Sequence, residues 1–226
     1  SAELRRQFER AYLEQQATQQ ANIKALQSQI NPHFLNNTLE IINWEARMAD
    51  NERVSTMIEA LSTMLKAALD RNGRTKIPLS EELGYVDAYL YIIRERLGEG
   101  FRVHKDIDES ILALPVPRLV LQPLVENAVE HDITANRGGD LWVRAYRQAD
   151  RVVLEVEHDG TLTREDRQKI QSLLAQSAQG AAAGGQVGLR NVSQRLKLIY
   201  GDGGILTLDQ TRAGTILARV SIPAGR

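Results

Sequence analysis

Cysteine is absent from the 226-residue sequence, and neither sign of charge dominates it, because 28 Lys and Arg stand against 29 Asp and Glu. Without cysteine the chain holds no disulfide, no thiolate nucleophile and no Cys-ligated zinc or iron–sulfur site. The formal net charge of −1 lacks the basic footprint typical of nucleic-acid-binding proteins. The remaining composition, 42% hydrophobic and 25% charged, is that of an ordinary globular protein.

Long apolar runs and several common catalytic motifs are missing as well. No run approaches the ~20 residues of a membrane span, and residues 1–30 lack the apolar segment of a signal peptide. We therefore expect a soluble, cytosolic piece of protein, and its start at Ser1 predicts a trimmed fragment. The sequence has no P-loop, dinucleotide fingerprint, zinc-protease motif or hydrolase nucleophile elbow.

Glycine and proline are scarce only in the first half of the chain. Residues 1–97 hold two Gly and two Pro, whereas fourteen Gly and four Pro follow from Gly98 onward, mixed with β-branched runs. This shift predicts a mostly helical part followed by a mixed part, with the change near residues 98–116.

The first half is predicted to be a helical hairpin plus a connecting helix. Good helix formers fill residues 3–48, and apolar residues recur every three or four positions over 51–70. Ser80 is placed to cap a third helix that ends near Leu97. Polar residues interrupt the apolar seam of residues 3–30, which fits either a weak coiled coil or a solvated helix.

The second half alternates between strand and helix patterns, which predicts an α+β sandwich of one sheet and one helical layer. We expect strands over residues 101–107, 142–146, 152–156, 205–208 and 215–222, a turn at Gln148–Arg151, and helices over 118–132, 163–177 (capped by Thr163) and 188–200.

His33 is the first candidate for chemistry, because it follows Pro32 inside a predicted helix. Proline removes a backbone hydrogen bond there, so we expect a kink that presents the imidazole outward. A neutral imidazole nitrogen is a competent nucleophile at cytosolic pH. Asn37 and Glu40 lie one and two helical turns further on and are placed to orient the ring. The alternative is a bend with an incidental surface histidine.

Asn127 and His131 form the second candidate, since they share one helix face at a spacing of four. An amide oxygen suits a Mg²⁺ ion that also holds phosphate oxygens. A solvated polar helix face explains the same pattern without any ligand.

The third candidate combines the strand end Glu157–Gly160 with the glycine-rich segment Gly184–Asn191. A glycine-rich entry to a helix offers free N–H groups and a positive dipole end to a phosphate. The Ala-, Gln- and Gly-rich stretch between them suits a lid over a ligand. A plain flexible linker over residues 178–185 is the alternative.

Together these segments resemble the cytoplasmic half of LytS/YesM-type sensor histidine kinases. The phosphoacceptor pattern N-P-H-F-L-x-N-T-L is complete from Asn31 to Leu39, Val116–Ala128 resembles the N box, and Gly188–Val192 resembles the G2 box. The resemblance implies an α-helical hairpin for dimerisation and phosphoacceptance, followed by an α+β two-layer sandwich of the GHKL ATPase type. It implies a signalling helix over 1–26, a dimerisation and histidine phosphotransfer domain over 27–98, and a catalytic domain over 99–226.

The same resemblance implies the roles of individual residues. His33 would accept the γ-phosphoryl group of ATP, with Asn37 and Glu40 as further catalytic residues, and Asn127 would hold Mg²⁺. The implied nucleotide-binding residues are Asn127, His131, Asp159, Gly160, Gly185, Gly188, Leu189 and Thr215. The phosphoryl group would then pass to an Asp of a response-regulator receiver domain.

The resemblance also implies partners and a cellular place. Such kinases work as homodimers, bind no nucleic acid, and reach the membrane only through upstream segments absent from this sequence. The chain is therefore expected to be the cytoplasmic portion of a bacterial inner-membrane receptor.

The nucleotide-reading motif departs from the family pattern. Where the G1 box reads D-N-G-x-G, this chain has His158, Asp159, Gly160, Thr161 and Leu162. The loss of the base-reading Asp predicts weaker binding of ATP, because a buried donor would be left unpaired.

Two further departures lie in the neighbouring boxes, where Asp132 and Gln186 replace expected glycines. The main prediction is an active kinase; the alternative is a degenerate kinase that acts as a scaffold or as a response-regulator phosphatase. An ATPase or Ser/Thr kinase on the same fold is disfavoured, because the Asn31–Leu39 segment would have no use there.

Overall fold

A tight turn joins the first two helices of the computed structural model, which describes residues 32–69, 74–175 and 186–224. Helix α2 (Pro32–Met48) is followed by α3 (Glu52–Leu69), in agreement with the predicted hairpin. Asn51 caps α3, because its side-chain oxygen accepts the N–H of Val54 at 3.2 Å. The choice between a coiled coil and a solvated helix concerns residues 3–30, outside the described residues.

The chain divides into two units, Ser1–Ile58 and Glu59–Arg226. The domain boundaries predicted at 26/27 and 98/99 are not tested by this division and stay predictions. Among the described residues, no helix is both long enough and apolar enough to cross a bilayer.

Helix α4 (Leu79–Leu97) buries its predicted apolar seam in the core of the second unit. The predicted cap at Ser80 is wrong, because α4 begins at Leu79 and Pro78 precedes it without a side-chain cap. Backbone carbonyls take that role: Leu112 accepts the N–H of Ser80 at 2.9 Å, and Leu114 accepts the N–H of Leu79 at 3.0 Å. A short antiparallel pair, β1 (Lys76–Pro78) with β3 (Pro115–Pro117), leads into this loop.

Five strands form one sheet in the order β2-β4-β5-β7-β6. Its strands are β2 (Phe101–Ile107), β4 (Gly139–Gln148), β5 (Arg151–Asp159), β6 (Ile205–Gln210) and β7 (Thr215–Pro223). All five were predicted, and the turn at Gln148–Arg151 is confirmed by the pairing of those two residues. Strand β2 pairs with β4 in parallel and stands at one edge; the other neighbours are antiparallel.

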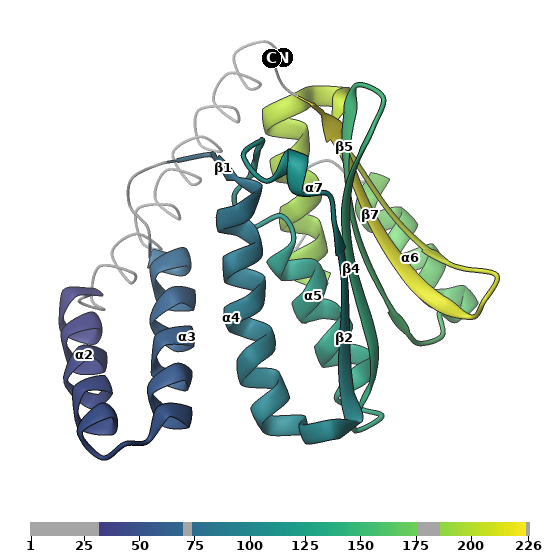
Figure 1. Ribbon diagram of the computed structural model, residues 1–226. Helices are drawn as coiled ribbons and strands as arrows, with labels where there is room; N and C mark the ends of the chain where they lie inside the picture. Colours follow the sequence, from purple (N-terminus) through teal and green to yellow (C-terminus); the bar gives the residue numbers. More distant parts are fainter. Residues whose placement is uncertain (1–31, 70–73, 176–185, 225–226) are drawn as a thin grey trace, which may run out of the picture. The chain divides into compact units, whose positions relative to one another are not determined.

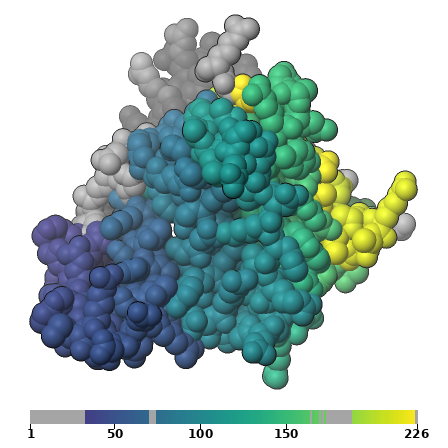
Figure 2. Space-filling model, in the orientation of Figure 1, coloured from purple at the N-terminus to yellow at the C-terminus, as the bar shows by residue number. Residues whose placement is uncertain are grey.

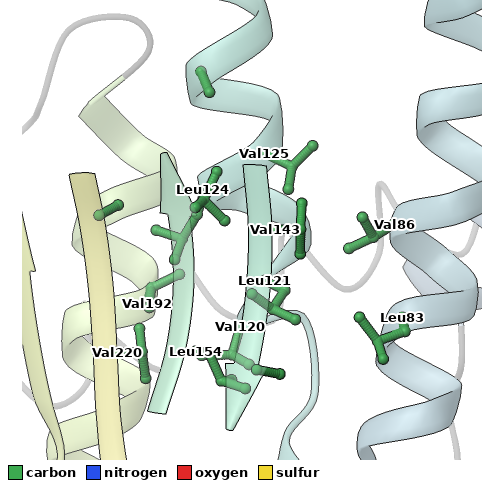
Figure 3. Close-up of a cluster of buried hydrophobic side chains, with 14 of the residues drawn as sticks. Leu83, Val86, Val120, Leu121, Leu124, Val125, Val143, Leu154, Val192 and Val220 are labelled. Carbon is green, nitrogen blue, oxygen red and sulfur yellow. The ribbon is translucent and has the colours of Figure 1, made fainter. Parts of the chain in front are cut away.

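One face of the sheet is covered by α4, α5 (Gln122–Ala128) and α7 (Gln186–Tyr200), so the predicted two-layer sandwich is confirmed (Figure 1). Side chains fill the space that the ribbon drawing leaves between α4 and the sheet, as the space-filling view shows (Figure 2). In Figure 3, Leu83 and Val86 of α4 point toward Val143 and the side chains of α5. Because strand residues alternate between faces, the opposite face carries charged side chains such as Arg144 and Glu155.

The helix predicted over residues 118–132 is shorter and differently shaped. Residues before Gln122 form a turn in which Leu119 has a φ of 55°, outside the helical region. After Ala128 the chain continues as the π-helix η3 (Val129–Ile133). The other elements are α6 (Arg164–Ala175) and the short 3₁₀ helices η1 (Gly98–Gly100), η2 (Glu109–Ile111) and η4 (Gly201–Gly203).

Candidate functional site

A cavity of about 280 Å³ opens in the second unit where α5, η3 and the end of β5 meet α6 and α7. One part of its wall is polar and the other is apolar, as expected for a small-molecule site. Its lining residues are Asn127, His131, Asp132, His158, Thr161, Leu162, Asp166, Ile170, Leu189, Leu208 and Ile216.

The predicted pair Asn127 and His131 lies in this wall, together with Asp132. The wide turn of η3 is closed by the N–H of Thr134, which donates to the carbonyl of Val129 at 2.8 Å, five residues back. Single π-turns of this kind are frequent at functional sites. The turn lets the side chains of Asn127, His131 and Asp132 line the same cavity, whereas a regular α-helix would direct the neighbours His131 and Asp132 about 100° apart.

His158 closes one end of the cavity from the inner side of β5, and its side chain is only 4% exposed. Its Nδ1 donates to the carbonyl oxygen of Asp159 at 3.1 Å. Burial lowers the pKa of His158, although the Asp159 carbonyl and the charges of Asp132 and Asp159 oppose that effect. The ring is therefore neutral near pH 7, with its proton on Nδ1 and a lone pair on Nε2.

Gly160 lets the Asp132 side chain lie directly against the backbone of the strand end. A Cβ atom at position 160 would meet Cγ of Asp132 at 2.9 Å and Cδ1 of Ile216 at the same distance. Position 160 therefore has no room for a side chain, because Asp132 and Ile216 pack directly against its backbone. This packing explains the glycine in the G1-like motif.

Four predicted nucleotide-binding residues that the structure describes are not among those that line the cavity: Asp159, Gly160, Gly188 and Thr215. The carboxylate of Asp159 turns to the start of β4 and accepts the N–H of Asp140 at 3.0 Å. The hydroxyl of Thr215 donates to Glu157 and lies 2.7 Å from the hydroxyl of Thr211. The structure therefore separates both side chains from Asn127 and His131.

The glycine-rich entry to α7 is described only in part. Gly188 lies beside α5, and an added Cβ there would be in van der Waals contact with Cβ of Pro123 at 3.4 Å. Its neighbour Leu189 is buried and lines the cavity, and its role in nucleotide binding stays a prediction. Gly185 lies outside the described residues.

Sequence reasoning missed most of the apolar wall. Leu208 and Ile216 come from alternate positions of β6 and β7, a period-2 signal that marks the inward face but not a cavity. Thr161, Leu162 and Ile170 lie in and after the altered G1 box.

Asp166 of α6 lines the cavity but also caps its own helix. The N–H of Asp166 donates to Oγ1 of Thr163 and the N–H of Thr163 donates to Asp166, each at 3.1 Å. This reciprocal cap confirms the predicted role of Thr163 and occupies the Asp166 carboxylate.

His33 belongs to the first unit, where it lies exposed on α2. Nδ2 of Asn37 lies 3.3 Å from Nδ1 of His33, so the pair predicted from the helical spacing is in contact. Glu40 is exposed further along the same helix. The expected kink at Pro32 falls at the border of the described residues.

The donor set of the cavity bears on which metal it suits. Over residues 32–69, 74–175 and 186–224, no three His, Asp or Glu side chains gather as an all-protein metal site. Mg²⁺ is usually held by one or two protein oxygens together with substrate phosphates. The amide oxygen of Asn127 in the wall fits that pattern.

Two protein families match the sequence in the same order as the two structural parts. The histidine kinase family matches residues 21–101, and the family of histidine kinase-, DNA gyrase B- and HSP90-like ATPases matches residues 115–226. The chain belongs to the sensor histidine kinases. The resemblance drawn from Asn31–Leu39 and the N box is confirmed.

Several sensor histidine kinases are similar over most of this chain. YesM of Bacillus subtilis is 32% identical over 184 residues, covering 81% of this chain and 30% of that protein. YpdA of Escherichia coli is 33% identical over 199 residues, covering 88% and 34%. The chain thus spans about a third of the length of the curated relatives it matches.

The catalytic domain of histidine kinase ThkA shares the fold of this chain. The TM-score is 0.50 at 17% sequence identity, over 66% of this chain and 96% of that domain. The predicted GHKL-type sandwich is thereby confirmed as the fold of the second part.

Proposed function

We propose that this chain transfers the γ-phosphoryl group of ATP to His33 and then to an Asp of a response-regulator receiver domain. The observation that carries the proposal is the exposed His33 on α2, in contact with Asn37 and inside a complete phosphoacceptor segment. The cavity around Asn127 supplies the nucleotide site in the same chain.

The chemistry at His33 requires a lone pair on the attacking nitrogen. If Nε2 attacks, Nδ1 must carry the ring proton, and a half-turn of the Asn37 amide would bring its oxygen to the position that accepts this proton. The new N–P bond forms as the bond to the ADP oxygen breaks, and the ring then releases the Nδ1 proton. Asn37 therefore acts on ring orientation and tautomer, and Glu40 is proposed to assist the proton's departure.

The nucleotide site contributes positioning and charge neutralisation. Bound Mg²⁺ would supply the positive charge that phosphoryl transfer needs at the phosphate oxygens. The amide oxygen of Asn127 would hold it, while His131 and Leu189 line the same cavity. Gly188 and Gly185 are proposed to admit the phosphates to the start of α7. Asp159, Gly160 and Thr215 are proposed to support the cavity from the adjoining strand ends.

We propose a second copy of this chain as the partner of α2. Phe34, Ile41, Trp44 and Met48 follow one another at helical spacing and are 61–68% exposed. Exposed apolar stripes of this kind mark interaction surfaces. The sensory and membrane segments are proposed to lie in parts of the protein beyond this sequence, which places this part on the cytoplasmic side of a bacterial inner membrane.

A degenerate kinase is the second candidate, and His158 favours it, since it stands where the family has a base-reading carboxylate. Such a protein would serve as a scaffold or remove phosphate from a regulator. The LytS protein of Staphylococcus aureus carries the name sensor histidine kinase/phosphatase.

Labelling with γ-³²P-ATP and Mg²⁺ distinguishes the candidates. We expect acid-labile label in the wild type and none in His33→Gln. His104→Gln is the matched control, because His104 is an exposed histidine on β2, and it should label like the wild type. Label that persists in His33→Gln contradicts the proposal, and a folded wild type that binds no ATP supports the degenerate kinase.

A further inference from the structure

We propose that Asp132 is the residue that recognises the nucleotide base, by accepting a hydrogen bond from the exocyclic amine of adenine. This inference rests on the proposed function, because it assigns the specificity of the same cavity. It assigns base recognition to the end of the α5–η3 helix and away from the G1-like strand end.

The position of Asp132 follows from the π-turn. In a continuous α-helix, Asp132 would follow Ala128, which is 1% exposed and packs in the core. The wider turn of η3 shifts Asp132 toward the side of Asn127, and both side chains line the cavity. The π-turn thus moves the Asp132 carboxylate from the core side of the helix to the cavity.

The surroundings of Asp132 hold its carboxylate in the wall. Its side chain is 24% exposed, and Oδ2 lies 3.6 Å from Nδ1 of His158. That distance is too long for a hydrogen bond, and the His158 proton is already donated to the Asp159 carbonyl. Gly160 packs against the carboxylate from the other side. The Asp132 lone pairs therefore remain available to a ligand.

The neighbouring carboxylates are committed elsewhere. Asp166 accepts from Thr163 as the helix cap of α6. Asp159 accepts the N–H of Asp140 and does not line the cavity. Among the described residues that line the cavity, Asp132 is thus the acidic side chain that keeps its acceptor capacity for a base.

The chemistry of a carboxylate determines which base it selects. An ionised carboxylate accepts hydrogen bonds and donates none. The 6-amino group of adenine offers a donor to it, whereas a purine with hydrogen at position 6 offers none. A site built to bond a donor rejects an analogue without it, because its own polar group is left unpaired.

The test is a two-by-two comparison of binding by calorimetry with the full chain and Mg²⁺. The proteins are wild type and Asp132→Ala, and the ligands are ATP and purine riboside triphosphate, which lacks only the 6-amino group. We expect the wild type to prefer ATP by about tenfold or more, and Asp132→Ala to bind both ligands equally. Asp132→Asn, which retains one acceptor oxygen, should keep part of the preference.

Glu130→Ala is the matched control, since it removes an exposed carboxylate of the same π-helix that does not line the cavity, and it should keep the wild-type preference. Circular dichroism checks that each variant is folded. A preference for ATP that survives in Asp132→Ala, or that disappears in Glu130→Ala, overturns this inference alone. If the folded wild type binds neither nucleotide, the proposed function fails together with it.

Discussion

The buried carboxylate of Glu82 on α4 accepts the backbone N–H of Leu121 at 2.8 Å, one residue before α5 begins. The same carboxylate accepts the N–H of Leu119 at 2.8 Å. Arg195 of α7 donates to the carbonyl of Leu119 at 2.8 Å. The helix that carries Asn127 is therefore fixed at its start by α4 and α7 together.

Replacement of Glu82 should weaken the fold at this junction. Glu82→Ala leaves at least two buried N–H groups without an acceptor, which should lower the free energy of unfolding by about 2 kcal/mol or more. Glu82→Gln retains one acceptor oxygen and should cost less. Urea unfolding followed by circular dichroism measures both, with the exposed Glu99→Gln as control. A Glu82→Ala protein as stable as this control would contradict the expectation.

His158 should make the stability of the second unit depend on pH. Burial lowers the pKa of His158, so the unfolded chain takes up a proton below pH about 6.5 before the folded protein does. Stability therefore falls as the pH falls through this range. We expect the Tm to drop more between pH 7.5 and 5.5 in the wild type than in His158→Gln. Equal drops in calorimetry would show that His158 is not buried in its neutral form.

The Asp140 carboxylate should titrate abnormally because of Arg102. Hydrogen bonds from Arg102 and then from His104 lower the pKa of Asp140 to about 2. Its stabilising effect is complete above the unfolded pKa of about 3.9 and disappears as the pH falls toward 2. In Arg102→Gln we expect the Asp140 pKa to rise, measured by carboxyl carbon NMR. The exposed Arg147→Gln should leave it unchanged.

Gly160→Ala should displace Asp132 from the cavity wall. The new methyl group would lie 2.9 Å from Cγ of Asp132, so one of them must move. We expect ATP affinity to fall by about tenfold, as for the loss of one hydrogen bond to a charged group. Gly84→Ala is the control, because a Cβ there meets nothing within 4 Å; it should stabilise α4 by up to about 1 kcal/mol and leave ATP affinity intact. Equal affinities in both variants would argue against the contact.

Trp44→Asp should dissociate the proposed dimer. The substitution puts a charge in the exposed apolar stripe of α2, where Trp44 is 61% exposed. Light scattering after gel filtration should show a monomer, while the circular dichroism of the helices is unchanged. Glu45→Gln, at an exposed position beside it, should keep the oligomeric state of the wild type. A wild-type monomer would refute the assignment of this surface.

The sequence patterns correctly predicted those helices and strands that are determined by the residues within them. The five strands and α7 were found from periodicity, because alternate burial leaves a direct trace in the sequence. The cap by Thr163 was also predicted, because Thr163 and Asp166, the two residues that form it, lie within one helical turn. The start of α4 was misplaced because backbone carbonyls from a distant loop satisfy its first N–H groups.

The candidate site was predictable from motifs only in part. Asn127, His131 and Leu189, which the motif resemblance implied, line the cavity, and their part in nucleotide binding stays a prediction. The position of Asp132 depends on a π-turn. A prediction that assumes 3.6 residues per turn throughout the helix places Asp132 on a different face. Thr215 and Asp159 were placed by motif alignment, whereas hydrogen bonds across the sheet decide where their side chains turn.

The edge strand β2 bears on how copies of this chain associate. Its side chains at Arg102, His104, Lys105 and Asp106 are exposed and ionisable, and among the described strands β2 pairs in the sheet only with β4. Bare sheet edges attract strands of other molecules and start aggregation, and charged side chains along such an edge oppose that pairing. The β2 edge is thereby protected against pairing with strands of other molecules, which is compatible with the proposal that copies of this chain associate through the apolar surface of α2.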